Sequence, residues 1–433
     1  MLLEFLVENF RSFKNEVVLS MVASYDKTSE SDNVVKLCNG TRVLKSAAIY
    51  GYNATGKSNL IKALNVFLSY ILTSQDNNEN EEQKRNILPF LFNTETIDKP
   101  STFQIVFVHE AIQYRYGISM DQKRIHSEWL YASYSSRESK LFSRNKDEIE
   151  IGRKFPEGKK LAKNTRKDVP FLSVASYLNG ETSSKIFNWI KNVQIDPSRN
   201  IHPTSKLLLD ESKNGPEQLA VRRMIELVDL KISTIEVKEE NVPYAILDFI
   251  INNKNNTKRV IENDLIEGHE DNPSIPKTRM GHRVFDKDSV KPTSTCYLDL
   301  TEESQGTKRI YSLIGPILLS LKNGTLMVID EIERSLHPEL MKQIIAMYQS
   351  KKTNPNHAQL IFTTHDTTIL RDKELRRDQI WFLDKDHQGS SILFSLFDFS
   401  EHVRKDASWE KDYLDGRYTM SPKIKNLAQN LYR

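Results

Sequence analysis

The segment GYNATGKS, residues 51–58, constrains the fold more than any other stretch of this sequence. It follows the short apolar run 47–50 and precedes residues 59–73, in which apolar side chains recur at helical spacing. A strand, a glycine-rich loop and a helix in this order are the context in which G-x-x-x-x-G-K-[ST] binds phosphate. Glycines let backbone N–H groups turn towards the phosphate, and the helix N-terminus adds partial positive charge.

Two side chains of this segment suit a nucleoside triphosphate. Lys57 is expected to reach the β- and γ-phosphates, and Ser58 is expected to bind Mg²⁺. An ordinary strand-to-helix turn with a solvated lysine is the alternative. The motif therefore predicts ATP and Mg²⁺ as cofactors. The predicted contacts come from Gly51, Asn53, Thr55, Gly56, Lys57, Ser58 and Asn59.

Composition limits the class of protein but not its partner. The chain has 433 residues, enough for about two or three domains. Its 61 Lys and Arg against 58 Asp and Glu give a formal charge of +3, so any nucleic-acid contact must come from local patches. Cys38 and Cys296 have no metal-like spacing, which indicates a reducing compartment. No apolar run approaches about 18 residues and the first residues lack a signal-peptide pattern, so we expect a cytoplasmic, non-membrane protein.

Two regions are expected to form antiparallel β-structure. The alternating residues 3–7 precede a second β-rich run, 16–24, and predict a hairpin at a sheet edge. Arg11, in the turn of that hairpin, could contact a nucleotide phosphate or be solvated, and the sequence does not decide between the two. Short alternating runs within 101–143 predict an antiparallel β-subdomain. Its aromatic side chains are interpreted as packing groups, with base stacking as the alternative.

The middle of the chain has few recognisable motifs. Residues 153–167 hold seven Lys and Arg, and are a candidate contact for DNA or RNA, with a solvated loop as the alternative. Residues 151–290 are expected to form a mostly helical insertion, because helical stretches alternate with polar linkers. The mobile part of this insertion is expected near residues 269–282.

Three motifs nearer the C-terminus supply further chemistry. Ser304, in ESQGTKR, would place a hydroxyl and free backbone N–H groups at the start of an apolar helix, which favours an anion. The strand in TLMVIDE ends in Asp330 and Glu331, which suits one carboxylate for Mg²⁺ and one to polarise an attacking water. His365 ends the apolar run HAQLIFTTHD. Taken alone, these motifs could be a capped helix, an acidic pair at a strand end and a loop histidine.

Together, the P-loop, ESQGTKR, TLMVIDE, RSLHP and TTHD resemble the ATP-binding-cassette (ABC) ATPase heads of the SMC, recombination-repair and OLD lineages. More narrowly, LLEFLVENFRSFKN, LHPEL, DQIWFLDKD and YLDGRY look like the RloA or AbiL-type ATPases of bacterial restriction and phage-defence loci. The resemblance implies an α/β fold of the ABC-type P-loop ATPase head, with a mixed sheet and an antiparallel β-subdomain. It implies an N-terminal ATPase lobe over 1–150, the insertion over 151–290 and a C-terminal ATPase lobe over 291–433.

Site roles carry over by position. The resemblance makes Asp330 the Walker B carboxylate that binds Mg²⁺, Glu331 the general base and His365 the switch for the γ-phosphate. It also implies that Ser304 and Gly306 contact the nucleotide held by the opposite protomer. Gln305 departs from the usual transporter signature, in which two adjacent glycines follow the serine.

The implied function is an ATPase that converts ATP to ADP and phosphate. It would form a homodimer or higher oligomer around ATP and control a separate effector, a nuclease or toxin encoded nearby, in antiviral defence. The sequence contains no membrane segment, so a transporter is not expected. No heptad pattern persists long enough to predict a coiled coil.

Two other functions are considered. One is an OLD-type nuclease, because Asp384 and Asp386 imitate a D-x-D metal pair. However, residues 380–396 are interpreted more simply as a hairpin with a polar turn. The other is an ATP-gated DNA clamp or repair scaffold that has no effector.

Overall fold

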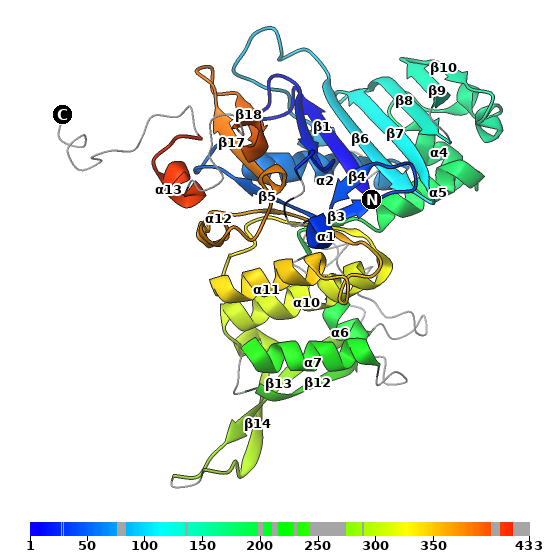
Figure 1. Cartoon of the computed structure of the whole chain (residues 1–433). Helices are drawn as coiled ribbons and strands as arrows, with labels where there is room; N and C mark the ends of the chain where they lie inside the picture. Colours follow the sequence, from blue (N-terminus) through cyan, green and yellow to red (C-terminus); the bar gives the residue numbers. More distant parts are fainter. Residues whose placement is uncertain are drawn as a thin grey trace. The chain divides into compact units, whose positions relative to one another are not determined.

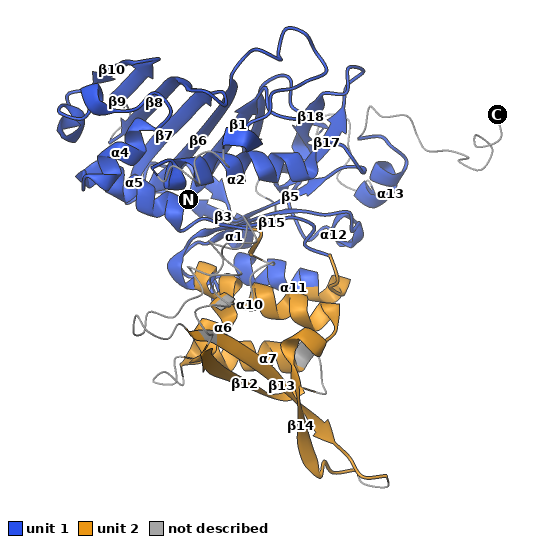
Figure 2. Ribbon diagram, turned by 180° about the vertical axis from the view of Figure 1, so that it is seen from behind, with its two compact units in different colours: residues 1–195, 321–333, 341–433 blue, residues 196–320, 334–340 orange. Residues whose placement is uncertain are grey.

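The chain divides into two compact units (Figure 2). The first comprises residues 1–195, 321–333 and 341–433, and the second comprises 196–320 and 334–340. These boundaries differ from those expected from the sequence, because residues 151–195 pack into the core of the first unit. The computed structural model describes residues 1–26, 28, 30–75, 84–134, 137–197, 202–209, 215–228, 232–241, 274–287, 290–399 and 408–418.

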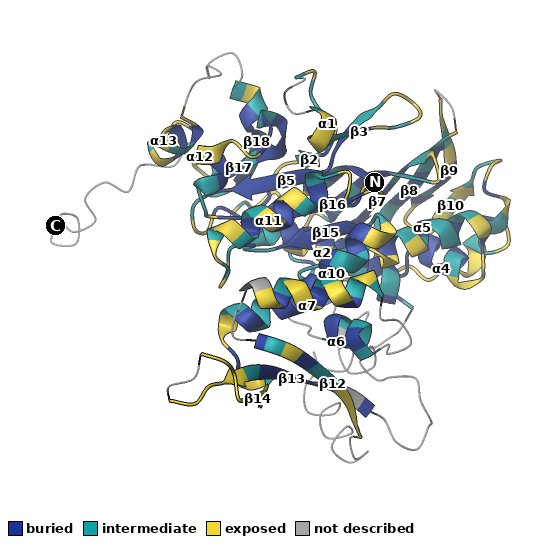
Figure 3. Cartoon of the chain, turned by 60° about the horizontal axis from the view of Figure 1, so that its bottom comes forward, coloured by how far each residue is buried: buried dark blue, intermediate teal, exposed yellow. Residues whose placement is uncertain are grey.

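The first unit contains a six-stranded mixed sheet of order β11-β15-β16-β5-β17-β18, of which β5, β17 and β18 are labelled in Figure 1. Neighbouring strands from β11 to β17 are parallel, and β17 and β18 form the predicted antiparallel hairpin. Strands β5, β15 and β16 are buried along their whole length (Figure 3). The strands are β5 (Ser46–Tyr50), β11 (Gln194–Ile195), β15 (Leu326–Ile329), β16 (Gln359–Thr363), β17 (Ile380–Lys385) and β18 (Ser391–Ser395).

The same unit also contains a seven-stranded antiparallel sheet of order β10-β9-β8-β7-β6-β1-β2. It confirms the predicted β-subdomain, and the β1–β2 hairpin lies at its edge as predicted. A short pair, β3 (Val34–Lys36) and β4 (Arg42–Leu44), follows the helix α1 (Glu30–Asn33). The strands of the large sheet are β1 (Leu2–Glu8), β2 (Val17–Ser20), β6 (Ser101–His109), β7 (Ile112–Met120), β8 (Ile125–Ser133), β9 (Glu138–Asn145) and β10 (Glu148–Ile151).

Helix α2 (Lys57–Thr73) packs its apolar face into this core, as its spacing predicts. Phe67 stacks on Phe103 and Tyr116, with ring centroids 5.7 and 5.9 Å away. These buried rings are therefore packing groups rather than platforms for bases. Two further helices of this unit, α4 (Phe171–Tyr177) and α5 (Glu181–Lys191), contribute apolar side chains to the same core.

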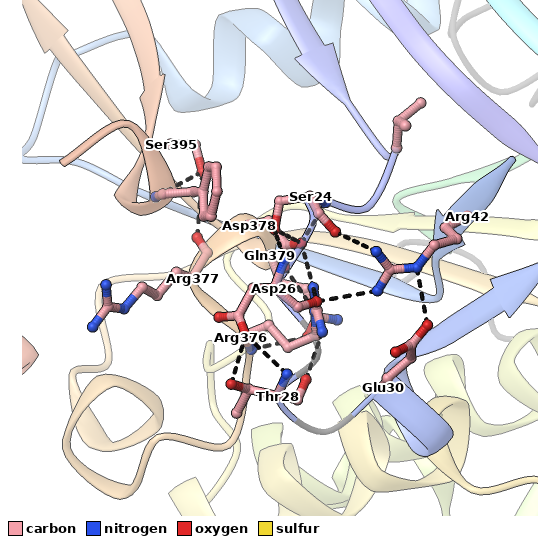
Figure 4. Close-up of polar contacts among 12 residues, drawn as sticks. Ser24, Asp26, Thr28, Glu30, Arg42, Arg376, Arg377, Asp378, Gln379 and Ser395 are labelled. Carbon is pink, nitrogen blue, oxygen red and sulfur yellow. Dashed lines mark hydrogen bonds and ion pairs between the residues drawn. The ribbon is translucent and has the colours of Figure 1, made fainter. Parts of the chain in front are cut away.

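A buried charge network ties the segment after β2 to the turn before β17 (Figure 4). The guanidinium of Arg376 donates to both carboxylate oxygens of Asp378, at 2.9 and 2.7 Å. It also donates to the carbonyls of Asp26 and Thr28. Asp378 in turn accepts hydrogen bonds from the backbone and hydroxyl of Ser24. Because the Arg376 side chain is fully buried, these partners compensate for the cost of removing its charge from water.

The second unit contains a three-stranded antiparallel sheet of order β12-β13-β14 as well as helices. The predicted helical insertion did not include this sheet. Residues 274–282, which were expected to belong to a mobile part, lie within β13, and their mobility stays a prediction. Residues 269–273 of that prediction lie outside the described residues. The elements are α6 (His202–Leu209), α7 (Pro216–Val228), β12 (Ile232–Asn241), β13 (Ser274–Val284), β14 (Ser294–Asp299) and α10 (Gln305–Asn323).

Candidate functional site

The predicted site residues of the first unit follow the carboxyl ends of neighbouring parallel strands. The P-loop follows β5, Asp330 follows β15, His365 lies just beyond β16, and β17 ends at Lys385. Ligands of such sheets bind outside the carboxyl ends of the strands, because loops and helix N-termini meet there. The topology thus brings together motifs that are far apart in the sequence.

The backbone conformation of the P-loop requires glycine at two positions. Gly56 has a φ of 113°, and a Cβ at this position would lie 2.4 Å from the hydroxyl of Ser391. A Cβ on Gly51 would lie 2.6 Å from the carbonyl oxygen of Leu383. A side chain at either position would collide with the β17–β18 hairpin, so the loop needs glycine at both.

Lys57 is held inside this loop. Its ammonium donates to the carbonyls of Gly51 at 2.7 Å and Tyr52 at 3.1 Å, and the residue is 6% exposed. Burial lowers the pKa of Lys57 to about 8, while the nearby carboxylates of Asp330 and Glu333 oppose that shift. A buried cation beside the glycine-rich backbone is suited to meet an anion.

One hydroxyl contacts both residues that follow β15, Asp330 through its carboxylate and Glu331 through its backbone. Thr363, at the end of β16, donates to Asp330 Oδ1 at 2.6 Å and accepts from the Glu331 N–H at 2.8 Å. Glu331 has a φ of 50°, a conformation that non-glycine residues adopt rarely and often at functional sites. Sequence reasoning missed Thr363, although its position in FTTHD, directly after an apolar strand, could have indicated it.

His365 lies in the loop after β16. Its backbone N–H donates to Glu333 Oε1 at 2.6 Å. Burial lowers the pKa of the imidazole, and the charge of Lys57 acts in the same direction. The neutral imidazole is therefore favoured at neutral pH, with one nitrogen as donor and the other as acceptor.

Lys57, Glu331 and His365 share a pocket of about 400 Å³ in the first unit. Of the predicted contacts that belong to the first unit, Gly51, Thr55 and Asp330 do not line the pocket and lie in the adjoining loop and strand end. Ser304 and Gly306, which belong to the second unit, are not among the lining residues either. Four lining residues were not predicted from the sequence: Ser12, Ala54, Phe92 and Lys385. The pocket is lined by Arg11, Ser12, Asn53, Ala54, Gly56, Lys57, Ser58, Asn59, Phe92, Glu331, His365 and Lys385.

Arg11 lies in the turn between β1 and β2 and lines this pocket. Its Nη2 donates weakly to the carbonyl of Asn86 at 3.4 Å, and its Nε is buried with no hydrogen-bond partner among the described residues. Its φ of 51° is unusual for a residue with a side chain. The sequence left open a phosphate contact or a solvated arginine. The buried Nε argues against the solvated arginine, whose Nε would be in water.

The signature-like residues belong to the second unit. The Ser304 hydroxyl accepts the backbone N–H of Thr307 at 3.1 Å, so Ser304 caps α10. A Cβ on Gly306 would approach the carbonyl of Ser335 to 3.0 Å. The preceding residue, Glu303, is buried and contacts His282 of β13 at 2.6 Å. The capped-helix interpretation is thereby confirmed, while the anion contact stays a prediction.

The basic segment 153–167 forms two short 3₁₀ turns, η1 (Pro156–Gly158) and η2 (Ala162–Asn164). Lys154 lies over the ring of Tyr134 at 4.5 Å, and Arg166 pairs with Asp168. All seven basic side chains of this segment are exposed to solvent: Arg153, Lys154, Lys159, Lys160, Lys163, Arg166 and Lys167.

Replacing Lys159, Lys160 and Lys163 with Glu tests the predicted contact with DNA or RNA. We expect weaker binding and a flatter salt dependence, by about 0.9 in the slope of log K against log salt for each duplex phosphate that the protein no longer neutralises. Fluorescence anisotropy over a salt series measures both quantities. Exposed Lys351 and Lys352, changed to Glu, provide the control. Unchanged binding at every salt concentration would leave this segment a solvated surface.

The two aspartates that imitate a nuclease metal pair support the β17–β18 hairpin. Asp386 Oδ1 accepts the backbone N–H groups of Gln388 and Ser390 at 2.8 and 2.9 Å, as is usual for a turn aspartate. Asp384 is fully buried and accepts the N–H of Lys385. Within the described ranges, no three His, Cys, Asp or Glu side chains come together in a group able to hold a metal ion.

Comparison with known proteins identifies one family for most of the chain. The protein-family model described as "AAA domain, putative AbiEii toxin, Type IV TA system" matches residues 46–371. A search of curated proteins found no match. In the part of the chain that the structure describes, no helix is both long and apolar enough to span a membrane.

Several solved structures resemble the chain in arrangement. The SMC head domain from Thermotoga maritima is 12% identical, with a TM-score of 0.41, over 91% of this chain and 98% of that chain. An SMC head bound to the C-terminal winged-helix domain of ScpA is 14% identical, with a TM-score of 0.44, over 91% and 97%. An SMC head from Pyrococcus furiosus, bound to the C-terminal domain of ScpA, is 14% identical, with a TM-score of 0.38, over 93% and 99%.

Proposed function

We propose that this chain, which belongs to the AbiEii-type family of AAA domains, binds and hydrolyses ATP in the pocket at the carboxyl edge of its six-stranded sheet. One observation carries this proposal. Lys57, Glu331 and His365, from three motifs far apart in the sequence, line the same pocket. They are respectively a buried cation, a carboxylate and a neutral imidazole, which are groups used to bind phosphate and to activate water.

The residues present fit a nucleoside triphosphate with Mg²⁺. The pocket of about 400 Å³ has a size usual for ligand sites, and Lys57 would meet the phosphates. Ser58 and Asp330 would hold Mg²⁺, since it prefers oxygen ligands. Bound there, Mg²⁺ would neutralise charge on the phosphates. The remaining P-loop contacts would come from Gly51, Asn53, Thr55, Gly56 and Asn59.

Three further side chains would act on the reacting end of ATP. Glu331 would accept a proton from the attacking water, and the neutral imidazole of His365 would hydrogen-bond the γ-phosphate. Arg11 would add a second positive charge, because its buried Nε has no partner among the described residues and the side chain lines the pocket.

Lys57→Ala tests this function. We expect nucleotide affinity to fall at least about tenfold and ATP turnover to be lost, because the variant removes the buried charge beside the phosphates. A fluorescent ATP analogue measures the affinity. Lys62→Ala, an exposed lysine of the same helix, should behave as wild type. Equal affinity of the Lys57 variant and wild type would contradict the proposal.

The wider role we propose is that of an RloA or AbiL-type ATPase in the cytoplasm. Two copies would enclose ATP, and their association would control a separate effector, a nuclease or toxin, in phage defence. The family description, which names a toxin and a toxin–antitoxin system, supports a link to a toxic activity. Purification with the product of the adjacent gene, with mass measured with and without ATP, tests it. An unchanged mass with no bound partner would contradict this role.

A further inference from the structure

The short helix α13 (Trp409–Leu414) lies near the C-terminal end of the described chain, and its side chains contact the P-loop. The ring of Tyr413, 4% exposed, stacks on Tyr52 with centroids 5.7 Å apart and planes at 15°. Tyr413 also packs against Tyr50, the last residue of β5 before that loop, and against Phe382 of the neighbouring strand β17. Burial raises the pKa of Tyr413, and the backbone N–H of Gly51 acts against that rise.

Tyr52 is the P-loop residue through which this contact reaches Lys57. Its carbonyl accepts the Lys57 ammonium at 3.1 Å and the Thr55 hydroxyl at 2.9 Å. A stacked ring limits the rotation of Tyr52, and the carbonyl of the same residue then has a defined direction. The aromatic contact therefore helps to fix the position of the Lys57 ammonium, which that carbonyl accepts.

The same helix also contacts the segment that follows β16. Glu410 Oε1 accepts the hydroxyl of Thr367 at 2.6 Å, two residues after His365. Helix α12 (Thr368–Asp372) begins directly after Thr367 and packs beside α13 (Figure 1). The loop that carries His365 is thus held by Glu333 at one point and by Glu410 at another.

We propose that α13 is a positioning element of the nucleotide site: Tyr413 positions the P-loop through Tyr52, and Glu410 positions the His365 loop through Thr367. This inference rests on the proposed ATPase function. Neither residue lines the pocket, so each acts through a residue that it holds. The P-loop would contact the phosphates throughout binding, whereas His365 would act on the γ-phosphate during turnover. The two contacts should therefore affect different kinetic constants.

Steady-state ATPase kinetics and ATP-analogue binding separate the two effects. Tyr413→Leu should weaken binding and raise KM about 2- to 10-fold with a smaller change in kcat, since it removes the stacked ring. Tyr413→Phe keeps the stacked ring but loses the hydroxyl beside the Gly51 N–H, so it should recover most of the loss. Glu410→Ala should lower kcat about 3- to 10-fold with KM little changed, and Glu410→Gln, which retains an acceptor oxygen, should recover most of it. Leu414→Ala, exposed on the same helix, is the control.

A double-mutant cycle shows whether Glu410 acts through its partner. Glu410→Ala combined with Thr367→Val should lower kcat no further than either change alone. Partial loss of folding would lower the apparent kcat without changing KM, but it would also lower the melting temperature, which a purely positioning role leaves unchanged. Suppose that the wild type binds ATP, but the Tyr413 and Glu410 variants either match it or change KM and kcat alike. That result would overturn this inference and leave the proposed function standing. Absence of ATP binding by the wild type overturns the proposed function as well.

Discussion

Glu331→Gln is expected to retain ATP binding and to lower hydrolysis by about 10²–10⁴-fold. The amide keeps the size of the side chain and a hydrogen-bonding oxygen, but it cannot take a proton from the attacking water. The backbone of Glu331 is held by Thr363 rather than by its own carboxylate, so the substitution should leave the loop in place. The proposed Mg²⁺ ligand, Asp330, keeps its own contact with Thr363. The lesion should therefore affect chemistry and spare affinity.

Phosphate release under saturating ATP measures the rate, and equilibrium titration with a fluorescent analogue measures affinity. Glu374→Gln, an exposed carboxylate of the same unit, should leave both unchanged. If turnover of the Glu331 variant stays within a few-fold of wild type, Glu331 is not the general base. If affinity falls as steeply as turnover, the side chain contributes to binding instead.

The parts of this fold that could be predicted are those specified by local sequence. The P-loop combines a strand, glycines and a helix within one continuous segment, so each residue type has a local reason. The β17–β18 hairpin has alternating strands around a polar turn, and the turn aspartate Asp386 makes the hydrogen bonds that such turns require. Both features need no knowledge of distant contacts.

The parts that could not be predicted depend on partners far along the chain. Thr363 orients Asp330 only because β15 and β16 are neighbours in the sheet. Tyr413 reaches Tyr52 across more than three hundred residues of sequence, and neither residue belongs to a motif that indicates the other. The sheet β12-β13-β14 was missed for a similar reason, because residues 242–273 separate β12 from β13 and no short turn links the two strands into a recognisable hairpin pattern.

The second large effect is expected at Ser304, if two protomers share each site. Ser304 lies at the N-terminus of α10, where backbone N–H groups and a hydroxyl favour an anion. Ser304→Arg should leave ATP binding by the single protomer nearly intact but abolish dimer formation with ATP and hydrolysis, because a bulky side chain would occupy the contact with the opposite nucleotide. Ser304→Asp separates this effect from helix capping. Aspartate is a good cap, so stability should be kept, while its charge should repel the phosphate.

Mixing Ser304→Arg with Lys57→Ala gives the sharper test of sharing. In an antiparallel pair, one site of the heterodimer carries both lesions and the other carries neither. Because one of the two sites in each mixed dimer is intact, ATPase activity should return in part, to no more than about half of wild type. If activity does not recover although crosslinking detects heterodimers, two explanations stay open: each site is self-contained, or the two sites are strictly coupled. The dependence of rate on concentration separates these outcomes: a shared site requires specific activity to fall on dilution below the dimer dissociation constant. A monomer that hydrolyses ATP at a constant specific rate would refute the shared site.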